Sequence, residues 1–125
     1  MQYLSNRGVR EVREWVDHLP DKRARVKIDE FIRDLQGVEK WRFPDTRVLH
    51  GCCAGLVELR ISCNKVEYRP LGFYAANHRF ILVFGAIEKC RGKAGKSDFD
   101  PPTACATALD RKRAILQGRA RTCEY

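Results

Sequence analysis

The chain has 125 residues, of which 44% are hydrophobic, and its formal net charge is +8 at pH 7. This length suits one domain with a single core, and the ordinary composition excludes a disordered or fibrous class. The sequence contains no run approaching the roughly 20 apolar residues of a membrane span, and residues 1–8 lack the apolar core of a signal peptide. We therefore expect one domain over residues 1–125, located in the cytoplasm and without a membrane partner.

Two amphipathic helices are predicted near the N-terminus. Apolar residues recur at helical spacing over about residues 8–19, and Pro20 ends that helix. Asp21 can cap a second helix over about residues 21–36, and Gly37 is expected to end it in a left-handed conformation. The charged face of the second helix is expected to be a solvated exterior. We expect both helices to pack on one face of the sheet that follows.

The chain over about residues 56–89 predicts a small antiparallel sheet of three strands. Residues 56–61 alternate apolar and charged side chains, so that Glu58 would lie on a solvated face. Residues 66–74 are rich in aromatic and branched side chains and form the second predicted strand. Residues 79–87 are apolar almost throughout, which indicates a strand buried on both faces in the middle of the sheet.

A basic loop and a third helix are expected after the sheet. The loop covers about residues 90–100, and its Gly95-Lys96-Ser97 resembles only the end of a P-loop because Cys90 stands where that motif requires glycine. We therefore reject nucleotide triphosphate hydrolysis. The third helix is predicted over about residues 101–117, beginning with a proline, which the first turn of a helix accepts. This helix can cover the sheet or swing away to admit a substrate.

The six cysteines invite a disulfide or a zinc interpretation. With no secretory signal evident, a reducing cytosol would keep them as thiols. The sequence has no C-x-x-C pair and its three histidines are scattered, so we expect no zinc site and no cofactor. An adventitious metal or redox role remains as the alternative to buried or incidental thiols at Cys52, Cys53, Cys63, Cys90, Cys105 and Cys123.

The positive charge is concentrated in the second half of the chain. Residues 1–55 carry 11 Lys and Arg against 9 Asp and Glu, whereas residues 56–125 carry 13 against 7. A concentrated basic surface attracts polyanions and speeds their encounter. We therefore favour a nucleic acid as partner over the alternative of a merely soluble basic protein.

Three cations are expected to converge at strand positions or strand ends: Arg60, Arg69 and Lys89. No Ser-His-Asp arrangement, paired-carboxylate signature or metal-binding cluster accompanies them. What remains is metal-free transesterification of RNA, in which a ribose 2′-oxygen attacks the adjacent phosphate and cations stabilise the developing negative charge. Glu58, Tyr68 and Lys89 are candidates for the required base and acid on chemistry alone.

Several strings of the sequence resemble one toxin family. Residues 55–60 read Gly-Leu-Val-Glu-Leu-Arg, residues 68–69 read Tyr-Arg, and the apolar strand ends Phe-Gly-Ala-Ile-Glu-Lys at residues 84–89. In this order and spacing they resemble the phage-derived Gp49-like, HigB-type toxins of the RelE/ParE superfamily. The string Glu-Trp-Val-Asp-His-Leu-Pro at residues 14–20 is similar too, and the match covers roughly residues 8–90.

The resemblance implies both a fold and a function. The implied fold is α+β and RelE-like, with two N-terminal helices packed on a small curved antiparallel sheet, plus a C-terminal helix that fits loosely. At most residues 2–4 remain of the strand with which the superfamily begins. The implied function is the toxin of a type II toxin-antitoxin system, a metal-independent, ribosome-dependent endoribonuclease that cleaves mRNA. Its partners would be mRNA, the ribosome and a cognate antitoxin, often a HigA-like protein with a helix-turn-helix.

The resemblance also assigns site residues. Arg69 takes the place of an arginine that contacts the scissile phosphate in RNase members, and Arg60 and Lys89 fall at basic positions. Glu58 stands where some relatives have lysine. No Tyr or His matches their catalytic acid, and Tyr125 would serve only if the tail folds back, so a ParE-like gyrase poison or an inactive antitoxin-binding relic stays open. The expected RNA- or ribosome-binding side chains are Lys65, Arg79, Arg91, Lys93 and Lys96.

Overall fold

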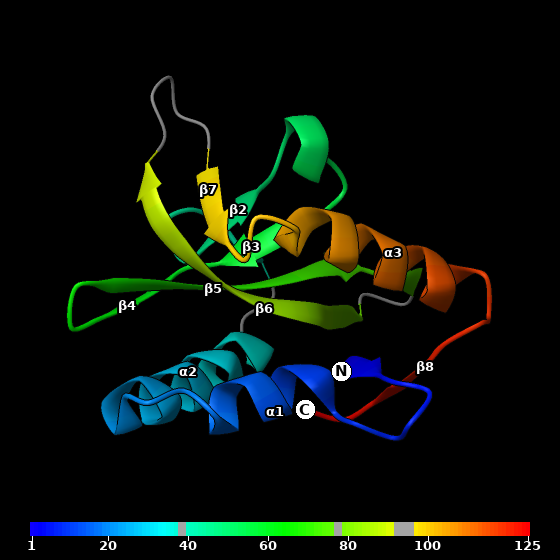
Figure 1. Cartoon of the computed structure of the whole chain (residues 1–125), viewed down its shortest axis with the longest axis horizontal. Helices are drawn as coiled ribbons and strands as arrows, with labels where there is room; N and C mark the ends of the chain where they lie inside the picture. Colours follow the sequence, from blue (N-terminus) through cyan, green and yellow to red (C-terminus); the bar gives the residue numbers. More distant parts are fainter. Residues whose placement is uncertain (38–39, 77–78, 92–96) are drawn as a thin grey trace.

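The computed structural model describes the backbone of residues 1–37, 40–76, 79–91 and 97–125, and the side chains of all of these except 89–91 and 97–98. The elements are shown in Figure 1. In chain order they are β1 (Gln2–Leu4), α1 (Glu11–Asp17), α2 (Lys22–Gln36), β2 (Thr46–Val48), the 3-10 turn η1 (Gly51–Cys53), β3 (Val57–Leu59), β4 (Ile61–Cys63), β5 (Val66–Tyr74), β6 (Phe80–Arg91), β7 (Ser97–Asp100), α3 (Ala104–Leu116) and β8 (Arg121–Cys123).

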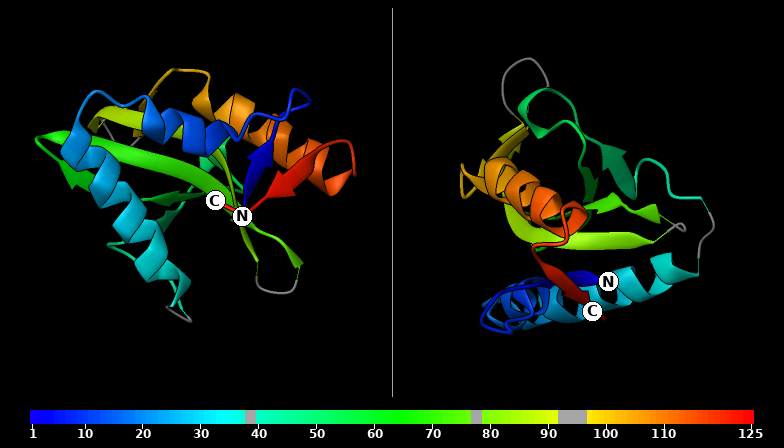
Figure 2. Two further views of the ribbon diagram at one scale, coloured as in Figure 1. Left: turned by 90° about the horizontal axis from the view of Figure 1, so that it is seen from below. Right: turned by 90° about the vertical axis from the view of Figure 1, so that its right-hand side faces the viewer.

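The strands of the described residues form one eight-stranded mixed sheet. Its order is β2-β3-β5-β6-β1-β8, with β4 also paired to β5 and β7 also paired to β6. The pair β1–β6 is parallel, whereas the other pairs are antiparallel. β1 and β8 pair with each other, which brings the two ends of the chain side by side (Figure 2). The 12-residue strand β6 lies in the middle of this sheet.

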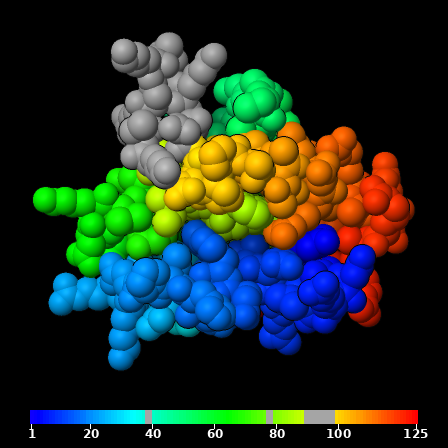
Figure 3. All heavy atoms as spheres, in the orientation of Figure 1, coloured from blue at the N-terminus to red at the C-terminus, as the bar shows by residue number. Residues whose placement is uncertain are grey.

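The predicted fold class, with two N-terminal helices on a small antiparallel sheet, is therefore wrong. The sheet is larger than expected and mixed, and its helices cover both faces. α1 and α2 lie below the sheet and α3 lies above it (Figure 1), and these layers remain distinct when all atoms are drawn (Figure 3). β1 corresponds to the strand remnant that the resemblance implied at residues 2–4. The strands that were not predicted, β2, β4, β7 and β8, have three or four residues each. Segments this short are too brief to display the period-2 pattern that identifies a strand.

Two hydrophobic clusters pack against opposite faces of the sheet. Side chains of α1 and α2, such as Val16 and Ile28, pack with Leu82 of β6 on one face. The neighbouring β6 residues Ile81 and Val83 belong to the other cluster, which includes side chains of α3. Successive strand residues point to opposite faces, so β6 is buried on both faces as its apolar sequence predicts.

Both ends of α1 and the start of α3 differ from the predicted boundaries, and α1 ends at Asp17 instead of about residue 19. The predicted cap of α2 is confirmed, because the Asp21 carboxylate accepts hydrogen bonds from the backbone N–H of Arg23 at 2.9 Å and of Ala24 at 3.4 Å. Gly37, however, ends α2 with φ −90°, so the left-handed stop is wrong. α1 begins at residue 11 because a turn with Gly8 at φ +78° precedes it. α3 begins at residue 104 because the chain first completes β7.

The prediction that every cysteine is a thiol is wrong. Cys53 of η1 and Cys105 of α3 form a disulfide, with their Cα atoms 5.2 Å apart. The two cysteines are 52 residues apart in the chain, and only the packing of α3 beside η1 brings them together. Cys52, Cys63 and Cys123 are free thiols among the cysteines whose side chains are described. In the described part of the chain, no helix is long and apolar enough to cross a bilayer.

Gly85 is expected to tolerate no side chain because the indole of Trp15 lies directly on it. A Cβ atom at position 85 would lie 1.9 Å from Cδ2 of Trp15. Gly85→Ala must therefore displace this ring, and we expect the free energy of unfolding to fall by about 1–3 kcal/mol in urea denaturation. The control is Gly37→Ala, because a Cβ there would meet nothing closer than the Asp34 carbonyl oxygen at 3.6 Å. Equal stability of the two variants would contradict this packing.

Candidate functional site

Five charged side chains from three neighbouring strands and the residue after β3 form an ion cluster: Glu58, Arg60, Glu67, Arg69 and Glu88. Glu67 and Arg69 are two residues apart in β5, so their side chains leave the same face of the sheet. The register of β5 and β6 sets Glu67 opposite Glu88. Arg60 lies between β3 and β4, where its backbone N–H bonds to the carbonyl oxygen of Asp45 instead of to β5.

Arg69 is buried at the centre of the ion cluster, with 2% of the residue exposed. Its Nε donates to Oε2 of Glu88 at 2.9 Å and lies 3.6 Å from Oε2 of Glu58. Its Nη2 donates to Oε2 of Glu67 at 2.9 Å, and its Nη1 donates to the backbone carbonyl oxygen of Tyr68 at 3.0 Å. Every guanidinium nitrogen is therefore engaged, and Arg69 offsets the charge of carboxylates on three strands.

Glu58 is completely buried, which contradicts its predicted place on a solvated face. Its carboxylate is enclosed by the other charged side chains of the ion cluster and interacts with Arg60, Arg69 and Glu88. Oε1 of Glu58 accepts a hydrogen bond from Nη1 of Arg60 at 2.9 Å, whereas Oε2 has no hydrogen-bond partner among the described residues. Burial raises the pKa of Glu58 above its ordinary value, although the nearby charges of Arg69 and Arg60 oppose this shift. A buried carboxylate with a raised pKa and a free oxygen is a typical feature of functional sites.

A cleft of about 500 Å³ opens beside the ion cluster. We call it the charged cleft. The guanidinium of Arg60 lies 5.3 Å from the ring centroid of Phe43, a side chain that is 65% exposed. The charged cleft is lined by residues of α2, the segment before β2, the strands β4, β5 and β6, and the two links on either side of β4. They are Lys27, Phe31, Pro44, Asp45, Arg60, Ile61, Ser62, Lys65, Glu67, Arg69 and Glu88.

Glu67 is the member of the ion cluster that is most open to solvent, with 41% of its side chain exposed. It accepts hydrogen bonds from Nη2 of Arg69 and from the hydroxyl of Ser62. Both donors and the ion pair lower the pKa of Glu67, so its carboxylate is charged at neutral pH. An anionic group of a ligand that entered the cleft would compete with this carboxylate for the same two donors.

The structure brings some of the predicted site residues together and separates others. Glu58, Arg60 and Arg69 meet in the ion cluster, and Lys65 lines the charged cleft. Arg79 does not line this cleft and instead lies in a separate pocket at the start of β6. The remaining predictions fall outside what the structure describes. Lys89 and Arg91 belong to β6 but their side chains are not described, and Lys93 and Lys96 lie outside the described residues altogether.

The two tyrosines considered as acids lie elsewhere. Tyr68 is 3% exposed and contacts Trp15 edge to face, on the face of the sheet opposite to the ion cluster. The tail does fold back, but the Tyr125 hydroxyl donates to Asp29 at 2.6 Å and its ring lies 4.7 Å from the Arg13 guanidinium. None of the described residues that line the charged cleft is a tyrosine or a histidine.

Sequence reasoning missed Glu67, Glu88 and Lys27. The i, i+2 spacing of Glu67 and Arg69 was a usable signal, because it places both on one face of a strand. Glu88 had no such signal, since its position depends on the register of β5 and β6. Lys27, expected to be solvated, instead donates to the backbone carbonyl oxygen of Ser62 and lines the cleft.

In comparisons with known proteins, no family model, no curated protein and no solved structure matches the chain. The described residues also contain no group of three or more His, Cys, Asp or Glu side chains arranged to hold a metal ion. What can be inferred about function therefore comes from the residues of the charged cleft and the ion cluster.

Proposed function

We propose that the chain is the toxin of a type II toxin-antitoxin system, an endoribonuclease that cleaves mRNA on the ribosome at the charged cleft. The observation that carries this proposal is a buried glutamate of raised pKa, Glu58, held by Arg60 and Arg69. The same three residues belong to the strings that resemble HigB-type toxins. Among the described residues, four cations and three carboxylates line the cleft beside them. Lys27 and Lys65 add positive charge to the cleft, and such charge attracts an RNA backbone.

In this proposal the reaction is a transesterification that the chain's own side chains assist. The ribose 2′-oxygen attacks the adjacent phosphorus and the bond to the 5′-oxygen breaks. The leaving 5′-oxygen takes a proton from water, so the products are a 2′,3′-cyclic phosphate and a 5′-hydroxyl. Arg60 donates to the phosphate as negative charge accumulates. Glu58 is 0% exposed and does not itself line the charged cleft, so it would accept the 2′-hydroxyl proton through Oε2, the oxygen without a hydrogen-bond partner in the described structure, only after the ion cluster opens to the ribose.

Access to the ion cluster requires Glu67 to move. Its exposed side chain is free to turn outward, and a substrate phosphate would then take its place on Nη2 of Arg69 and the hydroxyl of Ser62. The exchange replaces one anion with another, so the buried guanidinium of Arg69 keeps a negative partner throughout. Without such a partner a buried charge is strongly destabilising.

The proposal places the chain in the cytoplasm, where mRNA is translated, with a cognate antitoxin as its protein partner. The disulfide between Cys53 and Cys105 is unusual for this location, where cysteines are normally kept as thiols. Both residues are shielded, at 8% and 7% exposed, which slows its reduction. Exchange with cellular thiols depends on access to the sulfur atoms.

Primer extension on cellular mRNA after induction of the chain tests the proposal. We expect cuts inside translated codons, and we expect the purified chain to reproduce them on translating ribosomes at a magnesium level that keeps the ribosomes intact. Intact mRNA together with DNA breakage would contradict the ribonuclease and identify a gyrase poison.

A second candidate function is a non-enzymatic binder, either a gyrase poison or a relic that binds only its antitoxin. Two observations favour it. Arg69 has all of its guanidinium nitrogens engaged by protein groups, and no tyrosine or histidine is recorded at the cleft within the described chain. Growth arrest without cuts in mRNA would support the poison, and the absence of growth arrest would support the relic.

A further inference from the structure

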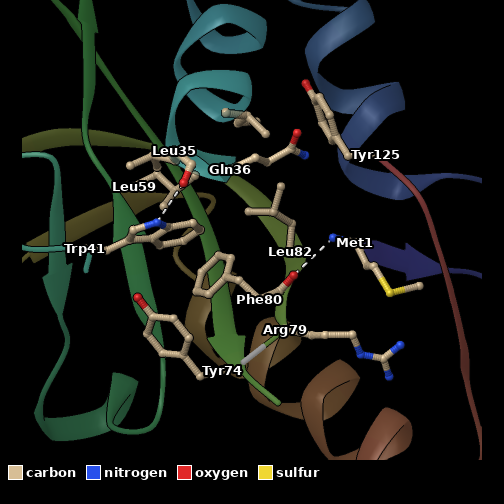
Figure 4. Close-up of a pocket in the computed structure, with 11 residues that line it drawn as sticks. Met1, Leu35, Gln36, Trp41, Leu59, Tyr74, Arg79, Phe80, Leu82 and Tyr125 are labelled. Carbon is tan, nitrogen blue, oxygen red and sulfur yellow. Dashed lines mark hydrogen bonds between the residues drawn. The ribbon is translucent and has the colours of Figure 1, made fainter. Parts of the chain in front are cut away.

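A second cavity, of about 310 Å³, has a wall of aromatic rings. We call it the aromatic pocket. The rings of Trp41 and Phe80 have centroids 4.7 Å apart, and Tyr74 lies 5.1 Å from Phe80 and 5.7 Å from Trp41. Figure 4 shows these three rings grouped on one side, with Gln36 and Met1 bordering the other side.

Within the aromatic wall, the Trp41 ring is held by a hydrogen bond, whereas the Tyr74 ring is exposed. Nε1 of Trp41 donates to the backbone carbonyl oxygen of Leu35 at 2.9 Å, which fixes the indole against the end of α2. Tyr74, at the end of β5, is 53% exposed although it contacts both other rings. The core therefore does not require the Tyr74 ring to be buried, and part of this ring is available to a flat ligand.

The aromatic pocket and the charged cleft are adjacent along the chain in two places. Leu59 lines the pocket, and the next residue, Arg60, lines the cleft. Trp41 in the pocket wall is separated by a single residue from Phe43, whose ring lies against Arg60. The two cavities are therefore bordered by the same two chain segments, and an RNA strand that follows these segments from Arg60 would pass the aromatic pocket.

We propose that the aromatic pocket binds one unpaired nucleobase of the RNA whose phosphate enters the charged cleft. This inference rests on the proposed function and specifies where a nucleotide beside the scissile phosphate is held. Stacking on aromatic side chains is the usual way in which proteins bind unpaired bases. The side-chain amide of Gln36 offers a donor and an acceptor to the edge of a base, and the exposed guanidinium of Arg79 offers a partner to its phosphate.

An apolar side chain of a partner protein is the other occupant that such a pocket admits. The nucleobase is favoured because the pocket carries its own exposed cation, Arg79, in a chain of net charge +8. A purely apolar ligand would use neither the amide nor the guanidinium.

The test is quenching of tryptophan fluorescence by short unstructured oligoribonucleotides, because Trp41 lies in the pocket wall whereas Trp15, the other tryptophan, packs on Gly85. We expect Tyr74→Ala to weaken RNA affinity by about 10-fold, within the range measured for loss of one base–aromatic stack. Tyr74→Phe keeps the ring and should bind like the wild type. Val48→Ala, at a side chain that is 60% exposed on β2, is the control for removal of exposed apolar surface.

Failure of this inference is distinguishable from failure of the proposed function. If Tyr74→Ala binds RNA as tightly as the wild type while mRNA is still cut, the aromatic pocket does not hold a base and the ribonuclease stands. If Tyr74→Ala loses RNA affinity but the wild type cuts no mRNA, base binding in the aromatic pocket is supported and the proposed ribonuclease activity is contradicted. Quenching by an antitoxin peptide but not by any oligoribonucleotide would contradict nucleobase binding and would show that the pocket binds a protein side chain.

Discussion

Replacing Arg69 with alanine is expected to lower the free energy of unfolding by about 3–5 kcal/mol at neutral pH, the cost typical of removing one partner from a buried ion pair. The guanidinium of Arg69 is the shared partner of Glu58, Glu67 and Glu88, and the first and last of these are buried. Without it, charged carboxylates remain in the interior with too few donors. Urea denaturation of the purified variant measures the loss.

The loss should depend on pH in a defined direction. Removing Arg69 takes away a charge that lowers the pKa of Glu58, so the pKa of the buried carboxyl rises further in the folded state. A raised pKa in the folded state destabilises the protein above the unfolded-state pKa, which is about 4.3 for glutamate, and this penalty vanishes below it. The difference between the variant and the wild type should therefore be smaller near pH 4 than at pH 7.

The control for the Arg69 variant is Arg113→Ala, in which an exposed arginine loses its single partner, Asp110. The side chains of this pair are 63% and 73% exposed, and exposed pairs contribute less than about 1 kcal/mol. Equal stability losses in the two variants would show that the ion cluster contributes no more than a surface pair. If the expected loss occurs, reduced toxicity of Arg69→Ala reflects unfolding and says nothing about catalysis.

Glu58→Gln is expected to slow mRNA cleavage by about 10²–10⁴-fold, the usual contribution of a general base. Glutamine has the same shape, and its amide oxygen keeps the hydrogen bond from Arg60 that Oε1 accepts in the wild type. It is unable to accept a proton from the ribose hydroxyl. Ribosome-dependent cleavage by the purified variant, with unfolding monitored in the same preparation, measures the effect.

The pH profile provides a second readout for the role of Glu58. Only the charged carboxylate acts as a base, so the cleavage rate should rise with pH as Glu58 loses its proton. Because burial raises the pKa of Glu58, this rise should occur at higher pH than for an ordinary glutamate. The residual activity of Glu58→Gln should lack this rise.

Glu14→Gln is the matched control for Glu58→Gln, because it makes the same change at a side chain of α1 that is 56% exposed. It should cleave mRNA at the wild-type rate. Cleavage by a folded Glu58→Gln variant at the wild-type rate would contradict the assignment of Glu58 as the base and would make the ion cluster a purely structural feature.

Local patterns in the sequence determined those parts of the chain that are long enough to show a period. The boundaries of α2, the cap at Asp21 and the doubly buried strand β6 follow from apolar spacing and from the chemistry of one side chain. The proximity of Arg60 and Arg69 was also predicted in part from the sequence, since strand alternation and chain order place both residues near Glu58.

The tertiary structure alone decided the size of the sheet, the disulfide and the environment of the ion cluster. Strands of three or four residues are specified by their partners, as β1 is by β6 and β8. Cys53 and Cys105 meet only because α3 packs beside η1. Glu58 is buried although its pattern predicts a solvated face, since alternation determines which face a side chain leaves but not what lies over that face.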